Sequence, residues 1–293
     1  MSEFIAPTLG RARGPLHPFE SEPRRDVVGT CRTHSGYGPG MIDTSGIDAK
    51  IGRAEEHYSS VVERITAWQR RSPHRLSFEK DPDGRQRTAR LVVHEEIPRD
   101  VALGIGDCVH NLRSSLDHLV WAATLARVTT PANPQRVMFP ICDDERQWTD
   151  EAPGSVGQLS TDLQAAIEEV QPFKRPASLA VNPLRLVSRM DNEDKRGLLQ
   201  PLLSAEHTVG AVVPGQQFEL TANLDVPLVD GSAVAQLILD QPDVDVQIDW
   251  ILAVAPMLEH EPYEGHTFAR VDVLLRRCID DIRTIARDLI PLT

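Results

Sequence analysis

The pattern of apolar and polar positions predicts one dominant helix near the middle of the chain. Between residues 98 and 128, apolar side chains recur at alternating spacings of four and three, as on a helix with one buried face. The predicted buried positions are Ile105, Val109, Leu112, Leu116, Leu119, Ala123 and Ala126. The opposite flank carries many groups that can bind or transfer protons: Asp107, His110, Asn111, Arg113, Ser114, Asp117 and His118. This helix is therefore the first place to look for a functional site.

Other segments have the same helical periodicity. Residues 47–71, 183–203 and 267–289 are each expected to form a helix with one apolar side. A shorter helix is expected to begin at Ser160 and to end before Pro172. The last long helix is expected to return and pack beside the central one.

Two regions alternate with a period of two, which is typical of strands. Residues 75–94 have the pattern of a β-hairpin around a turn that contains Asp81, Pro82, Asp83 and Gly84. Residues 206–262 predict an antiparallel sheet with one face toward water. The expected fold class is therefore α+β, a helical bundle with a basic β-hairpin and an antiparallel β-sheet insertion before the C-terminal helix.

Domain boundaries follow from the same pattern. Residues 1–40 are rich in Pro, Gly, Arg and Ser and are expected to be a disordered N-terminal arm. A helical domain is expected over 41–205, the sheet over 206–262, and a helix that packs back on the bundle over 263–293. Met41 is a candidate for the true start of translation.

Composition is that of an ordinary soluble protein, with 41% hydrophobic and 25% charged residues. No apolar run approaches the roughly 20 residues of a membrane span, and the start of the chain lacks the apolar core of a secretory signal. The four cysteines lie far apart and contain no Cys-x-x-Cys pair, so reduced thiols are expected. These features favour a cytoplasmic protein with no membrane partner.

The net charge of −12 argues against a protein coated in nucleic acid, but the charge is unevenly distributed. Residues 64–90 contain eight Lys or Arg against three acids, whereas residues 197–269 contain eleven acids and no Lys or Arg. Any affinity for RNA is expected to come from the basic hairpin and to fall steeply with salt. The alternative is an ordinary solvated hairpin beside an acidic surface.

Arg113 and His118 on the central helix offer the chemistry for RNA cleavage without a metal or cofactor. An imidazole titrates near pH ~6.5 and can accept the proton of a ribose 2′-hydroxyl, while a guanidinium can hold a phosphate with two hydrogen bonds. Asn111, two turns before His118, would be a polar helper. A five-residue step rotates a side chain by about 140° around a helix, so a symmetric dimer of two such helices would bring these groups together.

The segment from Arg113 to His118, RSSLDH, resembles the Arg-x(4–6)-His motif of the HEPN superfamily. Its members are small helical bundles, and many are metal-independent ribonucleases that work as dimers. The resemblance implies that Arg113 and His118 are catalytic and that Asn111 and Ser114 support them. In many active members the residue after the arginine is Asn, Asp or His, whereas here it is Ser114.

A longer resemblance covers GDCVHNLRSSLDHL, FPI, IEEVQPF and the patch at Asp194-Lys195-Arg196. These segments are similar to a group of uncharacterised bacterial proteins in which that patch usually reads Asp-Lys-His-Arg. Together with Asp191, the patch could be a phosphate contact folded against the central helix; an exposed charged bend is the alternative.

The sequence therefore predicts a HEPN-like, metal-independent endoribonuclease that is dimeric. The catalytic residues would be Arg113, His118 and Asn111, and the substrate contacts would be Ser114, His110, Lys195 and Arg196. The alternative is a non-catalytic scaffold or ligand-binding protein, in which Arg113 only forms surface pairs with His110 and Asp117. Residues 259–266 contain two histidines and three glutamates, but Pro262 excludes a helical zinc motif, so a solvated loop is expected there.

Overall fold

The computed structural model describes residues 42–175, 182–205, 210–213, 217–224, 226–242, 249–251, 253–263 and 266–293. These residues belong to one compact unit, Tyr37–Thr293. The expected arm over 1–40 and the candidate start at Met41 lie outside the described residues. Helices and antiparallel sheets occur together, which confirms the α+β class.

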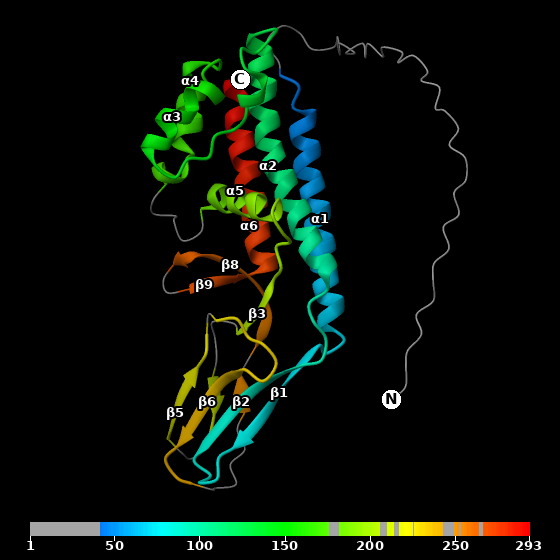
Figure 1. Ribbon diagram of the computed structural model, residues 1–293, viewed down its shortest axis with the longest axis vertical. Coiled ribbons are helices and arrows are strands. Elements are labelled where there is room, and N and C mark those ends of the chain that lie inside the picture. The colour runs from blue at the N-terminus through cyan, green and yellow to red at the C-terminus, as the bar shows by residue number, and fades with distance from the viewer. Residues whose placement is uncertain are drawn as a thin grey trace, which may run out of the picture. The chain divides into compact units, whose positions relative to one another are not determined.

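The described residues form six α-helices, which lie together in the helical part of the molecule (Figure 1). They are α1 (Ser45–Gln69), α2 (Arg99–Arg127), α3 (Glu145–Ser155), α4 (Thr161–Glu169), α5 (Pro183–Asp194) and α6 (Val271–Leu289). The long helices α1, α2 and α6 contact one another, and the shorter α5 contacts both α2 and α6. The final helix therefore packs beside the central one, as the sequence predicts.

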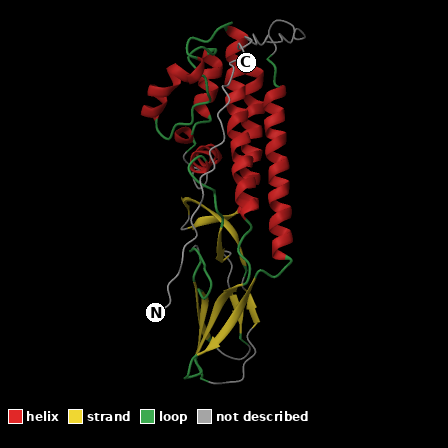
Figure 2. Cartoon of the chain, turned by 45° about the vertical axis from the view of Figure 1, so that its right-hand side comes forward, coloured by secondary structure: helices red, strands yellow, loops and turns green. Residues whose placement is uncertain are grey.

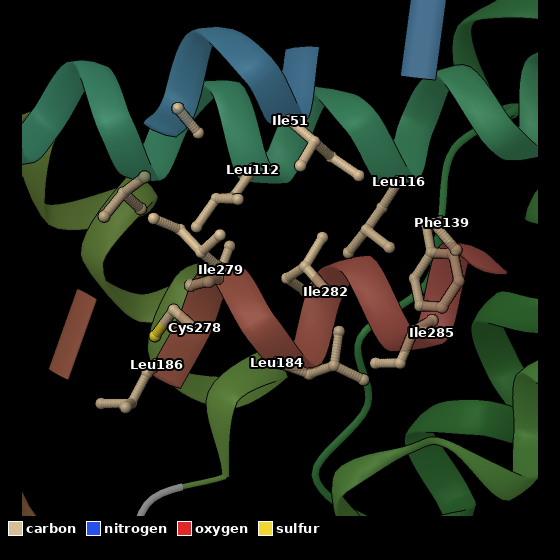
Figure 3. Close-up of a cluster of buried hydrophobic side chains, with 14 of the residues drawn as sticks. Ile51, Leu112, Leu116, Phe139, Leu184, Leu186, Cys278, Ile279, Ile282 and Ile285 are labelled. Carbon is tan, nitrogen blue, oxygen red and sulfur yellow. The ribbon is translucent and has the colours of Figure 1, made fainter. Parts of the chain in front are cut away.

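The main core lies where α1, α2, α5 and α6 meet. Six of the seven predicted apolar positions of α2 are buried, whereas Ala126 in its last turn is exposed. Figure 3 shows Leu112 and Leu116 of α2 facing Ile279 and Ile282 of α6. Each such fully buried side chain contributes about 1.5–3 kcal/mol of transfer free energy, so this contact fixes the relative positions of the helices that carry the polar flank.

Helix α5 begins at a strong local signal and ends earlier than expected. The Asn182 side chain accepts hydrogen bonds from the backbone N–H groups of Leu184 and Arg185, and Pro183 occupies the first turn. The helix ends at Asp194 instead of continuing to residue 203. Gly197 and Pro201 disfavour further helix, and residues 202–205 form a strand.

Helix α3 is absent from the sequence prediction. Its only buried residue is Ala152, so it has almost no apolar periodicity. Its start is nevertheless capped, because the Asp144 side chain accepts a hydrogen bond from the backbone N–H of Gln147.

The predicted hairpin is confirmed and belongs to a larger sheet. Strands β1 (His74–Lys80) and β2 (Gln86–Val93) are antiparallel. Strand β2 also pairs with β6 (Ala233–Leu239), which pairs with β5 (Phe218–Ala222), giving the order β1-β2-β6-β5. The hairpin and the later sheet region therefore share one sheet, and the hydrogen bonds of β2 and β6 cross the predicted boundary between domains.

The remaining strands form two smaller antiparallel sheets. One has the order β3 (Leu202–Ala205), β8 (Val254–Tyr263) and β9 (His266–Arg270); the other pairs β4 (Gly210–Val212) with β7 (Asp249–Ile251). Most of the segment 259–266, which we expected to be a solvated loop, belongs to β8 and β9. Helix α6 begins at residue 271 and not at 267, because residues 266–270 form β9.

The strands gather at one end of the helices (Figure 2). Trp68 near the end of α1 is fully buried and packs with Leu91 of β2, Leu203 of β3 and Val234 of β6. This second core joins α1 to the four-stranded sheet and to the three-stranded sheet that contains β3. Within the described part of the chain, the helices are too short or too polar to span a membrane.

Candidate functional site

The polar flank of α2 meets α5 at a buried carboxylate. Asp191, in the last turn of α5, has a side chain that is only 4% exposed. Its Oδ1 lies 3.0 Å from Nδ1 of His110, and its Oδ2 lies 2.5 Å from Nζ of Lys195. The side chains of His110 and Lys195 are 57% and 58% exposed. One buried carboxylate therefore holds two exposed groups that can transfer protons.

The surroundings of Asp191 explain why a charged group can be buried there. A carboxylate removed from water is costly unless cations or hydrogen-bond donors compensate it. Lys195 supplies a cation one turn further along the chain, and His110 supplies a ring nitrogen from α2. When Nδ1 of His110 donates to the carboxylate, Nε2 of the same ring becomes the acceptor. In this tautomer, His110 can act as a general base through Nε2.

Arg113 and Asp117 form a second pair, and both of them bind the backbone of Phe139. Arg113 Nη2 donates to the carbonyl oxygen of Phe139 at 2.8 Å and lies 3.1 Å from Asp117 Oδ1. Asp117 Oδ1 accepts from the N–H of Phe139 at 2.9 Å. The Arg113 side chain is only 16% exposed, and its Nη1 is buried without a partner among the described residues. The guanidinium thus fixes the segment that places the Phe139 ring in the core.

The two pairs share one electrostatic environment. Burial raises the pKa of Asp117, and the negative charge of Asp191 adds to this rise, while Arg113, the Phe139 N–H and Lys195 oppose it. Burial also raises the pKa of Asp194, helped by the charges of Asp107 and Asp191. The α2–α5 junction is therefore a continuous cluster of charged groups.

A third pair extends the cluster to α1. His57 Nδ1 of α1 lies 3.7 Å from Asp107 Oδ2 of α2. On α5, the carboxylate of Asp194 lies where a Cβ at Gly106 would be, so the missing side chain of Gly106 allows α5 to approach α2. His57 is not predictable from the sequence, because no motif on α1 marks it.

The other predicted catalytic residues contact different parts of the molecule. His118 is exposed, and a Cβ added at Gly46 of α1 would lie 2.6 Å from its Nδ1. Asn111 Nδ2 donates to the backbone oxygen of Asp107 on its own helix at 2.8 Å. His118 therefore packs toward α1 whereas Arg113 binds Phe139, and no hydrogen bond joins these two described side chains.

The predicted substrate contacts are partly brought together. His110 and Lys195 meet at Asp191. Ser114 lies one turn after His110 on the same flank of α2 and is half-buried. Arg196 is exposed and follows Lys195 directly. The charged patch at residues 194–196 is thus held near the central helix by the contact of Asp191 with His110, and not by the guanidinium of Arg196.

Much of the basic charge around the hairpin is compensated. Arg64 lies 3.3 Å from Asp100, Arg90 lies 2.6 Å from Glu79, and Arg71 binds Glu95. Arg87 donates to backbone oxygens of its own turn, those of Gly84 and Gln86. These pairs reduce the positive potential that the sequence alone suggests.

Neither a metal cluster nor a reactive thiol is evident within the described ranges. They contain no group of three or more His, Cys, Asp or Glu side chains arranged to hold a metal ion. The three described cysteines are free and buried, and burial raises the pKa of the Cys108 and Cys142 thiols to about 12. Such thiols behave as small apolar side chains.

No protein-family model, curated protein or solved structure matches the chain. The resemblance to the HEPN superfamily therefore depends on the motif around Arg113 and His118 alone.

Proposed function

We propose that the chain is a metal-independent endoribonuclease that cleaves RNA through the 2′-hydroxyl, with His110, which lies outside the HEPN motif, as its proton-transfer group. The 3.0 Å contact between His110 Nδ1 and Asp191 Oδ1 carries this proposal. A carboxylate bound to one ring nitrogen fixes the orientation of the imidazole and stabilises the imidazolium that forms when the other nitrogen takes a proton. The exposed ring leaves its Nε2 open to a substrate.

The reaction needs only groups of this site. His110 Nε2 takes the proton of the 2′-hydroxyl, and the O2′ atom attacks the adjacent phosphorus. The bond from phosphorus to O5′ breaks, and the O5′ atom takes a proton from the Lys195 ammonium. The products are a 2′,3′-cyclic phosphate and a 5′-hydroxyl, after which His110 and Lys195 exchange protons with water.

In this proposal the imidazole is that of His110 instead of His118. Arg113 already binds Phe139 and Asp117, so its guanidinium is not available to hold a phosphate. Arg196 would take over the phosphate contact, because it is exposed and lies next to Lys195. The Ser114 hydroxyl would contact the substrate one turn from His110.

The outer face of α2 supports the proposal of a homodimer. Leu103, Trp121 and Leu125 are large apolar side chains that remain exposed on this helix. Leu103 and Trp121 are separated by five full turns, and His110 lies within about 20° of the same line. A second copy that covers this face would place the two His110 side chains near one interface.

A non-catalytic scaffold or ligand-binding protein is the second candidate. The occupied guanidinium of Arg113 favours it, as do the carboxylates of Asp107, Asp117 and Asp194, which would repel a polyanion. We propose the cytoplasm as the compartment in either case, supported by the three free thiols.

RNA cleavage in the presence of EDTA tests the proposal. The purified full chain should convert end-labelled RNA to products with 2′,3′-cyclic phosphate ends. His110→Ala and Asp191→Asn should each reduce the rate by about 10²-fold or more. His94→Ala is the matched control, because His94 is an exposed histidine outside the cluster.

The outcomes separate the two candidates. Cleavage that survives His110→Ala but not His118→Ala would return the role to His118 and contradict the assignment made here. A wild-type chain that leaves a broad panel of RNAs intact would favour the scaffold. Circular dichroism of each variant distinguishes loss of chemistry from loss of fold.

A further inference from the structure

A cavity of about 710 Å³ lies over the outer surface of α6, away from the Asp191 cluster. Its walls include Tyr58 of α1, Arg175, Pro183 at the start of α5, and Arg276, Arg277 and Asp281 of α6. Pro183 and Asp191 are eight residues apart on α5, which corresponds to about 12 Å along the helix axis. The cavity and the His110 site therefore border opposite ends of the same helix.

The acidic residues of the cavity already have cationic partners. Both oxygens of Asp272 lie 3.0 Å from nitrogens of Arg270, and Asp281 Oδ1 lies 3.5 Å from Arg175 Nη1. Asp280 is 4.0 Å from Arg283, which does not line the cavity. Burial raises the pKa of Asp281, whereas the charges of Arg175 and Arg277 and a hydrogen bond from Arg175 oppose this rise.

Arg277 is the least compensated cation of this cavity, because its charge acts on that of Asp281 without a direct ion pair. It lines the wall and forms no ion pair or hydrogen bond with any of the residues described. Arg276 beside it makes only long contacts with carboxylates, 3.7 Å to Glu55 and 3.8 Å to Asp280. Two neighbouring guanidinium groups without a short carboxylate contact can bind an anion.

The same wall offers a planar surface. The guanidinium carbon of Arg276 lies 4.3 Å from the centre of the Tyr58 ring, which is within the range of a cation–π contact. A guanidinium is itself planar and can stack on a further planar ring, as arginine does with nucleobases. Val273 is exposed at the cavity and adds apolar contact area.

We infer that this cavity binds a nucleoside monophosphate, with the phosphate at Arg277 and the base stacked on Arg276. The volume is within the range of small-molecule sites, about 300–1,000 Å³. Phosphate and a planar ring are the two chemical features that the two arginines select together. This site goes beyond the proposed nuclease and does not depend on it.

Calorimetric titration of the full chain with AMP, adenosine and inorganic phosphate tests the inference. AMP should bind more tightly than either fragment. Arg277→Gln should weaken AMP binding by about tenfold or more. Arg276→Lys keeps the charge but removes the planar group, so it should weaken AMP binding while leaving phosphate binding nearly unchanged. The matched control is Arg287→Gln, which removes an exposed arginine of α6 that does not line the cavity.

Three results would overturn the inference: no AMP binding at millimolar concentration, equal affinity for AMP in Arg277→Gln and wild type, or phosphate binding as tight as AMP binding. His110→Ala should retain AMP binding whether or not the chain cleaves RNA. The titration therefore separates failure of this site from failure of the proposed nuclease.

Discussion

Gly104 of α2 and Val61 of α1 lie in direct contact: a Cβ added at Gly104 would be 2.6 Å from Cγ2 of Val61. Val61 is fully buried, and its branched side chain has little rotational freedom within a helix. The close approach of the two helices therefore depends on the absence of a side chain at residue 104.

Gly104→Ala should destabilise the protein although alanine is the better helix former. The overpacked contact should cost about 1–3 kcal/mol, which exceeds the gain in helix propensity of up to ~1 kcal/mol. Urea denaturation measures the difference. Gly52→Ala on α1 is the control, because nothing lies within 4 Å of its added Cβ, and it should stabilise. Equal stabilisation by both substitutions would contradict the close contact.

Asp194→Asn should stabilise the protein at neutral pH but not at acidic pH. The pKa of Asp194 is raised in the folded state, so the folded protein binds its proton more tightly than the unfolded chain does. The folded protein therefore loses stability as pH rises from the pKa of Asp194 in the unfolded chain to its higher pKa in the folded protein. Above the folded-state pKa the loss is complete and stays constant. The substitution should therefore raise the melting temperature at pH 7 by about 2 °C. If Asp194→Asn raised the melting temperature equally at a pH below the ordinary carboxyl pKa, the charge of Asp194 would not be the cause.

Arg113→Ala should destabilise the protein through Phe139. The substitution leaves Asp117 and the Phe139 carbonyl without their cationic partner, with an expected cost of about 1–3 kcal/mol. In a double-mutant cycle, Arg113→Ala and Asp117→Asn should couple by more than about 0.5 kcal/mol. Additive losses would mean that the two side chains act separately, which would reopen a substrate-binding role for Arg113.

Trp121→Glu should convert the proposed dimer to a monomer. A carboxylate on the outer face of α2 cannot be buried in a symmetric apolar contact without a large desolvation cost. Size-exclusion chromatography with light scattering measures the mass in solution. Val229→Glu is the control, because Val229 is exposed in a turn between strands. A wild-type monomer, or a dimer that survives Trp121→Glu, would exclude this interface.

The helices that form the main core could be predicted because their periodicity is long and uninterrupted. The apolar positions of α2 and α6 recur over many turns, and six of the seven positions that the sequence marks on α2 are buried. The end of α5 could not be predicted in this way. Leu198, Leu199, Leu202 and Leu203 continue a helical spacing, although Leu202 and Leu203 belong to β3.

The candidate site could be predicted in its parts but not in its connections. The flank of α2 and the patch at the end of α5 are both evident from residue types. The contact of His110 with Asp191 joins residues 81 positions apart, so it depends on the folded arrangement of two helices. The pairing of Arg113 with Asp117 could be predicted from their four-residue spacing, and the structure confirms it. The bond from Arg113 to Phe139 could not be predicted, because its acceptor is a backbone carbonyl, which any residue at position 139 would supply.

The pairing of β2 with β6 has a consequence for biosynthesis. A ribosome releases β2 long before β6 has been translated, so the nascent chain carries the apolar surface of Ala89 and Leu91 without its permanent cover. Contacts between segments so distant in sequence form slowly. Until they form, the exposed edge of a strand promotes aggregation. We therefore expect the edge of β2 to stay unpaired on the ribosome until translation has passed residue 239.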